Sequence, residues 1–347
     1  MTVQKKILII KLSALGDVIF TIPLANLLKK NGCEVHWLVT EKGYNIIKDN
    51  PCVDKAIFLP LYTWRKGKFS LKELIKIIRD LRREKYDISF DCQKRSKSLL
   101  FNLLCGAKRR IISRKGATEG SLLGANEYVE SVKNAPLHMV YRNLAYAAHI
   151  GFDTSEIHFT LPSVAHETKT KVDKLLANLD KSKPTIILAP ETTWESKHWD
   201  INNWHAVVDG LKDRANLVIT GSNPEFLKGG LNLAGQTTIE DLIEIFSRAD
   251  IVISPDSGSA HLAWATQKPA VIGIFTSTAP NIFGCFGDDK KYFALTGNIP
   301  CQPCFKRKCL HTHNECTKSP TPEKILKICY NYICHPELVS GSQAKRC

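Results

Sequence analysis

The sequence contains no apolar run that could cross a bilayer as a helix. Its longest uncharged stretch, residues 269–287, is interrupted by Pro, Gly, Ser, Thr and Asn, whereas a spanning helix needs about 20 mainly apolar residues. The pattern G-x-G-x-x-G is absent, so nothing supports a nicotinamide cofactor in a dinucleotide-binding domain. Asp-x-Asp pairs are absent as well, which argues against a diphosphate bridged to the protein by a carboxylate-bound metal ion.

The first residues resemble a signal peptide only superficially. Lys5 and Lys6 precede an apolar run, but the run ends at Lys11, and no small-residue cleavage site follows before Asp17. We therefore predict that this run is a buried strand of a cytoplasmic protein. A disulfide framework is not expected in such a chain.

The length of 347 residues suits two domains, and a composition of 44% hydrophobic and 24% charged residues is typical of a globular protein. The net charge of +14 is uneven. Residues 1–165 hold 27 Lys and Arg against 15 Asp and Glu, a net of +12, and the remainder holds 21 against 19, a net of +2. The first half is therefore expected to meet an anion, such as nucleic acid, a membrane surface or a phosphorylated substrate. A merely solvated basic surface is the alternative.

Short apolar runs alternate with amphipathic segments, which predicts parallel, doubly wound α/β sheets. The predicted strands are residues 7–11, 34–39, 56–59, 88–90, 185–189, 217–220, 251–254 and 270–275. The predicted helices are residues 71–83, 202–212, 239–247 and 260–266, and one that ends near Lys30 and either begins at Ile22 or bends at Pro23. The pattern restarts near residues 161–183, so we predict domains over 1–165 and 166–334 and a disordered tail over 335–347.

A loop with ligand-binding character follows the first predicted strand and reads Lys11-Leu-Ser13-Ala-Leu-Gly16-Asp17. In open α/β sheets, ligands bind at the carboxyl ends of the strands, where helix N-termini offer free N–H groups. Gly16 lets the backbone approach a ligand closely, and Asp17 places a carboxylate beside it. The simpler role for Asp17 is that of a helix cap.

Two more loops of this kind follow strands of the second domain. Residues 191–199 contain Thr192, Thr193 and Lys197, two hydroxyls and a cation that suit a diphosphate. Residues 254–261 read Ser-Pro-Asp-Ser-Gly-Ser-Ala-His, in which the amides of residues 257–259 form an anion-binding nest at the start of a helix. His261 lies one turn into that helix, where a buried histidine bonded to a loop carbonyl is an equally good interpretation.

The three loops together closely resemble glycosyltransferase family 9, the ADP-heptose:lipopolysaccharide heptosyltransferases. The resemblance extends from Ile7 to about Leu326 and rests on Lys11-x-Ser13-x-x-Gly16-Asp17 with Pro23, Thr192-Thr193 with Lys197-His198-Trp199, and Asp256-Ser-Gly258-x-x-His261 followed by Lys268-Pro269. The segment Cys301-Gln-Pro303-Cys304-Phe305-Lys-Arg307-Lys-Cys309 is similar to a stretch of heptosyltransferase II-type members. The family implies a GT-B fold, two Rossmann-like domains facing across a cleft, with the acceptor held mainly by the N-terminal domain and the ADP-sugar by the C-terminal one.

Carried over by position, the resemblance makes Asp17 the catalytic base and Lys197 the phosphate-binding lysine. The implied donor-binding residues are Thr192, Thr193, Glu225, Asp256, Ser257, Gly258 and His261. The implied acceptor-binding residues are Ser13, Gly16, Lys97, His138 and Arg142. The sequence departs from the family at Phe20, where histidine is frequent, and at Glu191, where a smaller residue is usual. Both positions are expected to line the cleft.

The resemblance implies an inverting transfer of a heptose or related sugar from an ADP-sugar, with ADP-heptose the expected donor, to the inner core of lipopolysaccharide. No cofactor and no metal ion are required. The expected partners are the nucleotide sugar, an anionic lipid-linked saccharide and, through peripheral contact, the inner face of the inner membrane; no nucleic acid is expected, and the protein is expected to be a monomer. The candidate acceptor cations are Arg65, Lys66, Lys68, Lys94, Arg95, Lys97, Lys108, Arg109, Arg110, Arg114 and Lys115.

Three alternatives stay open at this point. Another GT-B sugar-nucleotide enzyme, such as an epimerase, would need no anionic acceptor. A nucleic-acid-binding protein would use the basic clusters but leave both phosphate loops without a role. A zinc site is also open, because the second half contains a C-x2-C-x4-C-x6-C series with interleaved histidines that offer metal ligands; its residues are Cys301, Cys304, Cys309, Cys316, His311 and His313.

Overall fold

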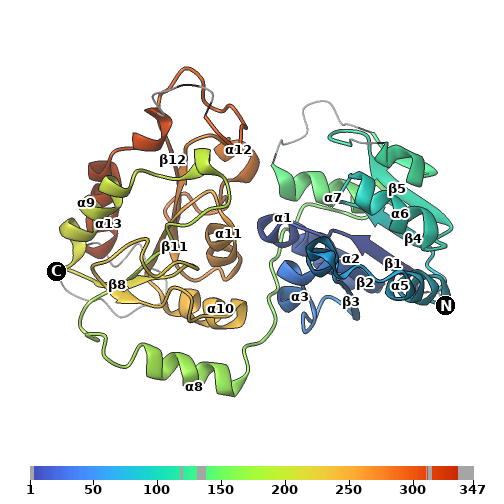
Figure 1. Ribbon diagram of the computed structural model, residues 1–347, viewed down its shortest axis with the longest axis horizontal. Coiled ribbons are helices and arrows are strands. Elements are labelled where there is room, and N and C mark those ends of the chain that lie inside the picture. The colour runs from blue at the N-terminus through green and yellow to red at the C-terminus, as the bar shows by residue number, and fades with distance from the viewer. Residues whose placement is uncertain (1–3, 118–119, 131–137, 310, 312–314, 335–347) are drawn as a thin grey trace. The chain divides into compact units, whose positions relative to one another are not determined.

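The computed structural model describes residues 4–117, 120–130, 138–309, 311 and 315–334. The chain divides into two compact units, Met1–Ser163 and Val164–Cys347. Each unit contains a six-stranded sheet in which neighbouring strands run parallel (Figure 1). The tail predicted to be disordered, residues 335–347, lies outside the described residues.

The sheet of the first unit has the strand order β3-β2-β1-β4-β5-β6. Its strands are β1 (Lys6–Ile10), β2 (Glu34–Thr40), β3 (Lys55–Leu59), β4 (Ile88–Asp91), β5 (Arg109–Ser113) and β6 (Glu127–Val129). Its helical segments are α1 (Leu15–Ile19), α2 (Ile22–Lys30), α3 (Glu41–Ile47), α4 (Leu61–Thr63), η1 (Trp64–Lys68), α5 (Leu71–Arg83), α6 (Ser96–Leu104), η2 (Ser121–Gly124) and α7 (Met139–His149).

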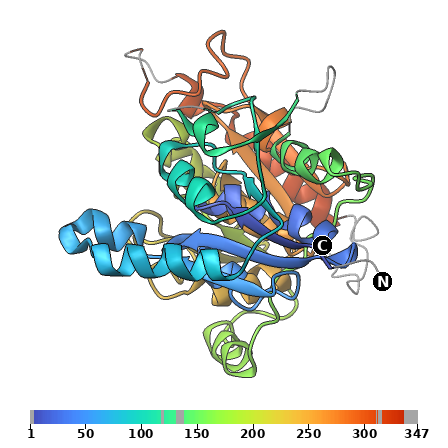
Figure 2. The same ribbon diagram turned by 90° about the vertical axis from the view of Figure 1, so that its right-hand side faces the viewer.

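Strand β1 lies at the centre of this sheet because every residue from Ile7 to Ile10 is apolar and fully buried. Successive apolar residues are what a strand covered on both faces requires. On one face, Leu8 packs in a core with Leu81 of α5 and Phe101 of α6. Figure 2 shows α5 (cyan) running alongside the strands of this sheet (blue). This core therefore anchors α5 while leaving its outer side to solvent.

The sheet of the second unit has the strand order β12-β11-β10-β7-β8-β9. Its strands are β7 (Thr185–Leu188), β8 (Asn216–Ile219), β9 (Leu231–Asn232), β10 (Ile251–Pro255), β11 (Ala270–Phe275) and β12 (Tyr292–Thr296). Its helical segments are α8 (His166–Leu175), η3 (Glu195–Lys197), α9 (Ile201–Leu211), α10 (Ile239–Arg248), α11 (Gly258–Ala265), α12 (Pro280–Phe283), η4 (Glu315–Lys318) and α13 (Pro322–Cys334).

The core of the second unit joins four strands to two helices. Ile186, Ile253 and Ile272 of the central strands pack with Trp204 of α9 and Ile325 of α13. Each strand of this group is short and apolar, and each is followed by a polar loop, so the carboxyl edge of the sheet is where side chains capable of chemistry gather.

The predicted strands and helices are all present, with ends that differ by one or two residues. The helix that ends at Lys30 begins at Ile22, with Pro23 in its first turn, where a missing N–H is harmless. The predictions missed the strands β5, β6, β9 and β12 and the helices α3, α6, α7 and α13. Strand β5 was missed because Arg109 and Arg110 open it and looked like a surface cluster. Within the described parts of the chain, none of the helices combines the length and the apolar character that crossing a membrane demands.

Candidate functional site

The carboxyl ends of β7, β10 and β11 meet at one edge of the second sheet, because β10 pairs in parallel with both other strands. The loops that follow these strands carry Lys197, Asp256 and Thr278 respectively. The three side chains make direct contact there, although about 60 residues separate the first from the second.

Asp256 is the centre of this cluster and is 2% exposed. Its Oδ2 lies 2.6 Å from the Lys197 ammonium and accepts a 2.6 Å hydrogen bond from the Thr278 hydroxyl. Its Oδ1 lies 3.1 Å from His261 Nε2. Burial by itself raises the pKa of Asp256, but the hydrogen bonds and charges of His261 and Lys197 hold it well below its ordinary value. Asp256 is therefore a fixed anion that positions Lys197.

Lys197 also lies among aromatic rings. Its ammonium is 4.6 Å from the ring centre of Trp194 and 5.9 Å from that of Phe283. The guanidinium of Arg307 lies 5.8 Å from the same Trp194 ring. Two cations from distant parts of the chain thus lie near one indole ring, and a site lined by more than one cation suits a diphosphate.

The segment that carries Arg307 is fastened to the Lys197 loop through the backbone. Ser196 N donates to the Arg307 carbonyl at 3.2 Å, and the Ser196 hydroxyl donates to the Lys306 carbonyl. Phe305 N donates to the Ser277 carbonyl at 2.9 Å. The cysteine-bearing segment therefore lies between the loops that follow β7 and β11. Sequence reasoning assigned no role to Thr278 or Arg307, although Arg307 lies within the cysteine-bearing segment quoted for the resemblance.

The first turn of α11 lies beside Asp256. Ser257 is the N-cap, and its hydroxyl accepts hydrogen bonds from Ser259 N at 3.2 Å and Ala260 N at 3.4 Å. The predicted nest is therefore smaller than expected, because the cap occupies the Ser259 amide. Gly258 is the first residue of α11, and the partial positive charge of the helix N-terminus adds to that of Lys197.

The two threonines that follow β7 differ in their surroundings. The Thr192 hydroxyl donates to the Asp256 carbonyl at 3.4 Å, and the Thr192 carbonyl lies 2.9 Å from His198 Nε2. Thr193 is exposed. Thr192 thus joins the Lys197 loop to the Asp256 loop, whereas Thr193 faces solvent.

Glu225 lies in the loop that follows β8. Glu191 follows β7, and its side chain contacts that loop. The Glu191 carboxylate accepts hydrogen bonds from Ser222 N at 2.8 Å and Asn223 N at 2.7 Å. A Cβ at Gly221 would lie 2.4 Å from Glu191 Oε1, so only glycine allows this close approach. Glu225 is exposed and pairs with Lys228 at 3.1 Å. Glu191 therefore fixes the loop from which the predicted nucleotide contact, Glu225, projects.

In the first unit, the loops that follow β1 and β4 are joined side by side. The Gln93 side chain accepts hydrogen bonds from Leu12 N at 2.9 Å and Ser13 N at 3.1 Å. Asp17 lies in α1 with its side chain 34% exposed, and its Oδ1 is 3.5 Å from Lys11 Nζ. Its Oδ2 accepts from Ala14 N at 3.2 Å. Asp17 is thus both a local cap and an accessible carboxylate held by a buried lysine.

Several cationic side chains lie around Asp17 among the described residues. Lys94 is buried, and burial together with the charges of Lys11 and Arg142 lowers its pKa to about 8, while Asp17 opposes that shift. Burial also lowers the pKa of Arg142, and its Nε has no hydrogen-bond partner within the described part of the chain. The nearby Asp91 is fully buried and its pKa is raised to about 6 by burial, against hydrogen bonds from the Lys94 amide and Ser98. Cationic side chains beside an accessible carboxylate suit an anionic ligand.

Some residues of the predicted acceptor set lie elsewhere or have other contacts. His138 is the N-cap of α7, where its Nδ1 accepts from Val140 N at 3.2 Å, and its ring meets Phe20 edge-on at 5.3 Å. Phe20 is 1% exposed, so the prediction that it lines a ligand site is wrong; it is a core residue. Lys97 is exposed on the first turn of α6, and Gly16 is buried beneath the Asp17 loop.

Several of the predicted acceptor cations are already paired. Arg109 binds Glu127 through two guanidinium nitrogens, at 2.7 and 2.5 Å, and Lys108 lies 2.9 Å from Asp87. These two cations belong to the edge of β5 and contribute little to an external anion site.

The four cysteines of the predicted zinc site do not form a coordination shell. Cys316 is buried, and burial and the neighbouring thiols raise its pKa to about 11. A tetrahedral zinc site holds sulfur atoms about 2.3 Å from the metal, yet among the described residues the only three metal ligands within 4.8 Å of one another are Glu34, His36 and Glu84. Lys6 already pairs with both of those glutamates. His313 lies outside the described residues.

Comparison with known proteins identifies relatives of the whole chain. The family model of glycosyltransferase family 9 (heptosyltransferase) matches residues 74–314. Lipopolysaccharide heptosyltransferase 1 of Pseudomonas aeruginosa is 24% identical over 326 residues, 89% of each chain. Lipopolysaccharide heptosyltransferase 1 of Campylobacter coli is 26% identical over 355 residues, which cover 93% of this chain and 97% of the relative.

Solved structures have the same fold. An E. coli heptosyltransferase in complex with ADP superposes with a TM-score of 0.72 at 20% identity, over 94% of this chain and 99% of that one. E. coli ADP-heptose lps heptosyltransferase II also gives 0.72, at 19% identity, over 96% and 99%. Two parallel α/β sheets, and a family model that covers more than half of the sequence, lead to one conclusion: this chain is a GT-B glycosyltransferase and belongs to glycosyltransferase family 9, the heptosyltransferases.

Proposed function

We propose that this protein transfers a heptose from ADP-heptose to the inner core of lipopolysaccharide, with inversion at the anomeric carbon and at the cytoplasmic face of the inner membrane. The names of its relatives, lipopolysaccharide heptosyltransferases, and the ADP bound in a structure of the same fold support this choice of donor and acceptor. The observation that carries the proposal is the buried Asp256 that holds Lys197 at the carboxyl edge of the second sheet.

The donor diphosphate would bind at that edge. Lys197 and Arg307, which both lie near the Trp194 ring, supply positive charge, and the N-terminus of α11 supplies backbone dipoles. Both carboxylate oxygens of Asp256 are occupied by His261, Lys197 and Thr278. Asp256 is therefore a positioning residue, because it keeps Lys197 in place when no phosphate is bound and cannot itself act as a base.

The acceptor would bind to the first unit at the Asp17 loop. Asp17 offers a 34% exposed carboxylate at that edge, with the Lys11 ammonium 3.5 Å away, and a positioned carboxylate can act as a general base. The cations Lys94, which is buried, and Arg142, which is half-buried, would hold a phosphate or carboxylate of the lipid-linked saccharide.

The proposed reaction assigns one role to each of these two sites. The acceptor hydroxyl gives its proton to the Asp17 carboxylate while its oxygen forms a bond to the anomeric carbon of the heptose. The bond between that carbon and the β-phosphate oxygen breaks at the same time, and its electrons leave with ADP. Lys197 and Arg307 stabilise the charge that develops on the leaving phosphate. Attack from the face opposite the leaving group inverts the anomeric carbon.

A donor and acceptor screen tests the proposal. Purified protein is incubated with ADP-heptose, other ADP-sugars and UDP-sugars, each with deacylated inner-core oligosaccharides, and products are detected by mass spectrometry. The expected product gains one heptose from ADP-heptose, and NMR should show the inverted anomeric configuration. Release of free sugar or an epimerised nucleotide sugar without a saccharide product would refute the assignment.

A further inference from the structure

The outer surface of α5 combines two features that are rarely found together on a free helix. Phe69, Leu71 and Ile75 are 56%, 60% and 55% exposed, so a row of large apolar side chains faces solvent. Residues 65–83 also hold eight Lys and Arg against two acidic residues, a net of +6. We name the surface formed by residues 65–83 the α5 surface.

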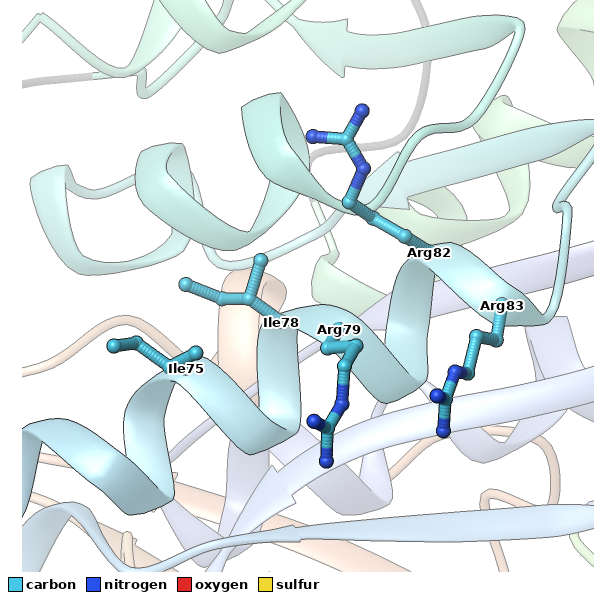
Figure 3. A pocket seen from close by; sticks show the side chains of 5 residues that line it. All are labelled: Ile75, Ile78, Arg79, Arg82 and Arg83. Atoms are coloured by element: carbon cyan, nitrogen blue, oxygen red, sulfur yellow. The ribbon is translucent and has the colours of Figure 1, made fainter.

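The apolar and basic side chains of α5 form two parallel stripes. Positions separated by three or four residues fall on one side of a helix. Leu71, Ile75 and Ile78 therefore form the apolar stripe, and the basic stripe beside it consists of Lys72, Lys76, Arg79 and Arg83. Arg82 follows Ile78 on the side of the apolar stripe. Ile75, Ile78, Arg79, Arg82 and Arg83 line a shallow groove. Figure 3 shows Ile78 and Arg82 projecting to one side of α5 and Arg79 and Arg83 to the other.

A third side of α5 attaches the helix to the rest of the first unit. Leu74, Ile77 and Leu81 pack into the core of the first unit, so the apolar stripe is additional to the residues that folding requires. The two acidic residues already have partners nearby. Glu73 accepts a hydrogen bond from Trp64 Nε1 at 2.8 Å, and Asp80 lies 3.8 to 3.9 Å from two arginines. No ion pair of Lys72 or Lys76 is present among the described residues.

The position of the α5 surface relates it to the Asp17 loop of the same unit. β3 ends at Leu59 and β4 begins at Ile88, so α5 runs back along two parallel strands, as a crossover helix must. Its N-terminal end, with Phe69 and Leu71, therefore lies at the carboxyl edge of the first sheet. That edge also carries Asp17 and Lys94.

We propose that the α5 surface docks on an anionic lipid bilayer, with the apolar stripe inserted among the acyl chains and the basic stripe against the headgroups. A helix with this distribution lies in the plane of a membrane interface, and a net of +6 complements the negative charge of the lipid surface. A second copy of the chain is the other occupant to consider. A two-fold dimer through this surface would place two segments of net +6 against each other, and cores of protein interfaces are depleted in lysine.

This inference goes beyond the reaction, and its test uses neither donor nor acceptor. Full-length protein is mixed with vesicles of pure phosphatidylcholine, or of phosphatidylcholine with about one third phosphatidylglycerol, and co-flotation is measured at low and high salt. We expect binding to the anionic vesicles only, weakened by salt because screening shortens to about 8 Å at physiological ionic strength. Binding to neither kind of vesicle would overturn the proposal.

Two double variants and matched controls locate the contact. Leu71→Ser/Ile75→Ser removes two side chains of the apolar stripe and should weaken binding to the anionic vesicles. Lys72→Ser/Lys76→Ser should reduce this binding by about fivefold for each cation removed. Control variants of exposed residues in the second unit, Ile201→Ser and Lys169→Ser/Lys174→Ser, should bind as the wild type does.

Two further measurements exclude trivial explanations. Circular dichroism and thermal melting should be unchanged in the α5 variants, because the substituted side chains are exposed. Hydrogen exchange over residues 65–83 should slow when anionic vesicles are added, which reports the contact in the unmodified protein. If the α5 and control variants lose binding equally, the attraction is a general charge effect and the assignment is wrong. If sedimentation shows a wild-type dimer that Leu71→Ser/Ile75→Ser dissociates, the surface is a protein interface instead.

Discussion

Substitution of Lys197 separates the structural role of the buried ion pair from its role in binding. Lys197→Met keeps the length of the side chain but leaves Asp256 buried with only His261 and Thr278 as partners. Breaking a buried pair costs about 3–5 kcal/mol when the remaining charge is uncompensated, and the two surviving partners should reduce that to about 1–3 kcal/mol. For a unit of this size, the corresponding fall in Tm is about 3–10 °C.

The effect of the substitution on donor binding should be separable from its effect on stability. A hydrogen bond to a charged group contributes about 1.5–3 kcal/mol, so Lys197→Met should weaken ADP binding about 10- to 150-fold. The double variant Lys197→Met/Asp256→Asn removes both charges and should recover most of the lost stability without recovering ADP affinity. Thermal melting and calorimetric titration of ADP measure the two quantities on the same three proteins.

Two results would refute the reasoning. Unchanged ADP affinity in Lys197→Met would show that the diphosphate binds elsewhere. A double variant no more stable than the single one would show that the Asp256 charge is not what Lys197 stabilises, and the positioning role of Asp256 would then fail.

Further predictions concern the base, the second cation and the response to acid. Asp17→Asn should lower turnover about 10²- to 10⁴-fold, the usual effect of losing a general base, with calorimetric ADP affinity unchanged; near-normal turnover excludes Asp17 as the base. Arg307→Ala should weaken binding of ADP several-fold but not of adenosine, whereas the neighbouring Lys308→Ala serves as control; equal losses for both ligands would place Arg307 away from the phosphates. The pKa of Glu84 is lowered from 4.5 to about 2, chiefly by Lys55, so its stabilisation is present above pH 4.5 and disappears as the pH falls towards 2. Between pH 5 and 3, the free energy of unfolding measured in urea should therefore fall by about 1–3 kcal/mol more for the wild type than for Glu84→Gln. If this free energy depended on pH identically in both proteins, the lowered pKa of Glu84 would be contradicted.

The local pattern was sufficient to predict most strands of the two sheets and several of their helices. Ile7–Ile10 and Ala270–Phe275 are apolar at successive positions and are buried strands, and α5 has the predicted ends, Leu71–Arg83. Such elements depend on periodicity and on short-range sterics, which neighbouring residues contain. Strand β5 was not predicted because its first two residues are arginines, and their partners, Glu127 and Gly124, lie further along the sequence.

The sequence by itself also determined the family and the residues around which its loops are built, because Lys11 to Asp17, Thr192 to Trp199 and Asp256 to His261 are short motifs. Only the tertiary structure decided which of these side chains meet. Folding brings Lys197, Asp256 and Thr278 together at the ends of three parallel strands, places Arg307 beside Trp194 and buries Phe20 against His138. The physical reason is that burial, ion pairing and a pKa depend on distances across the sheet, and those distances are set by strand order and packing rather than by separation along the chain.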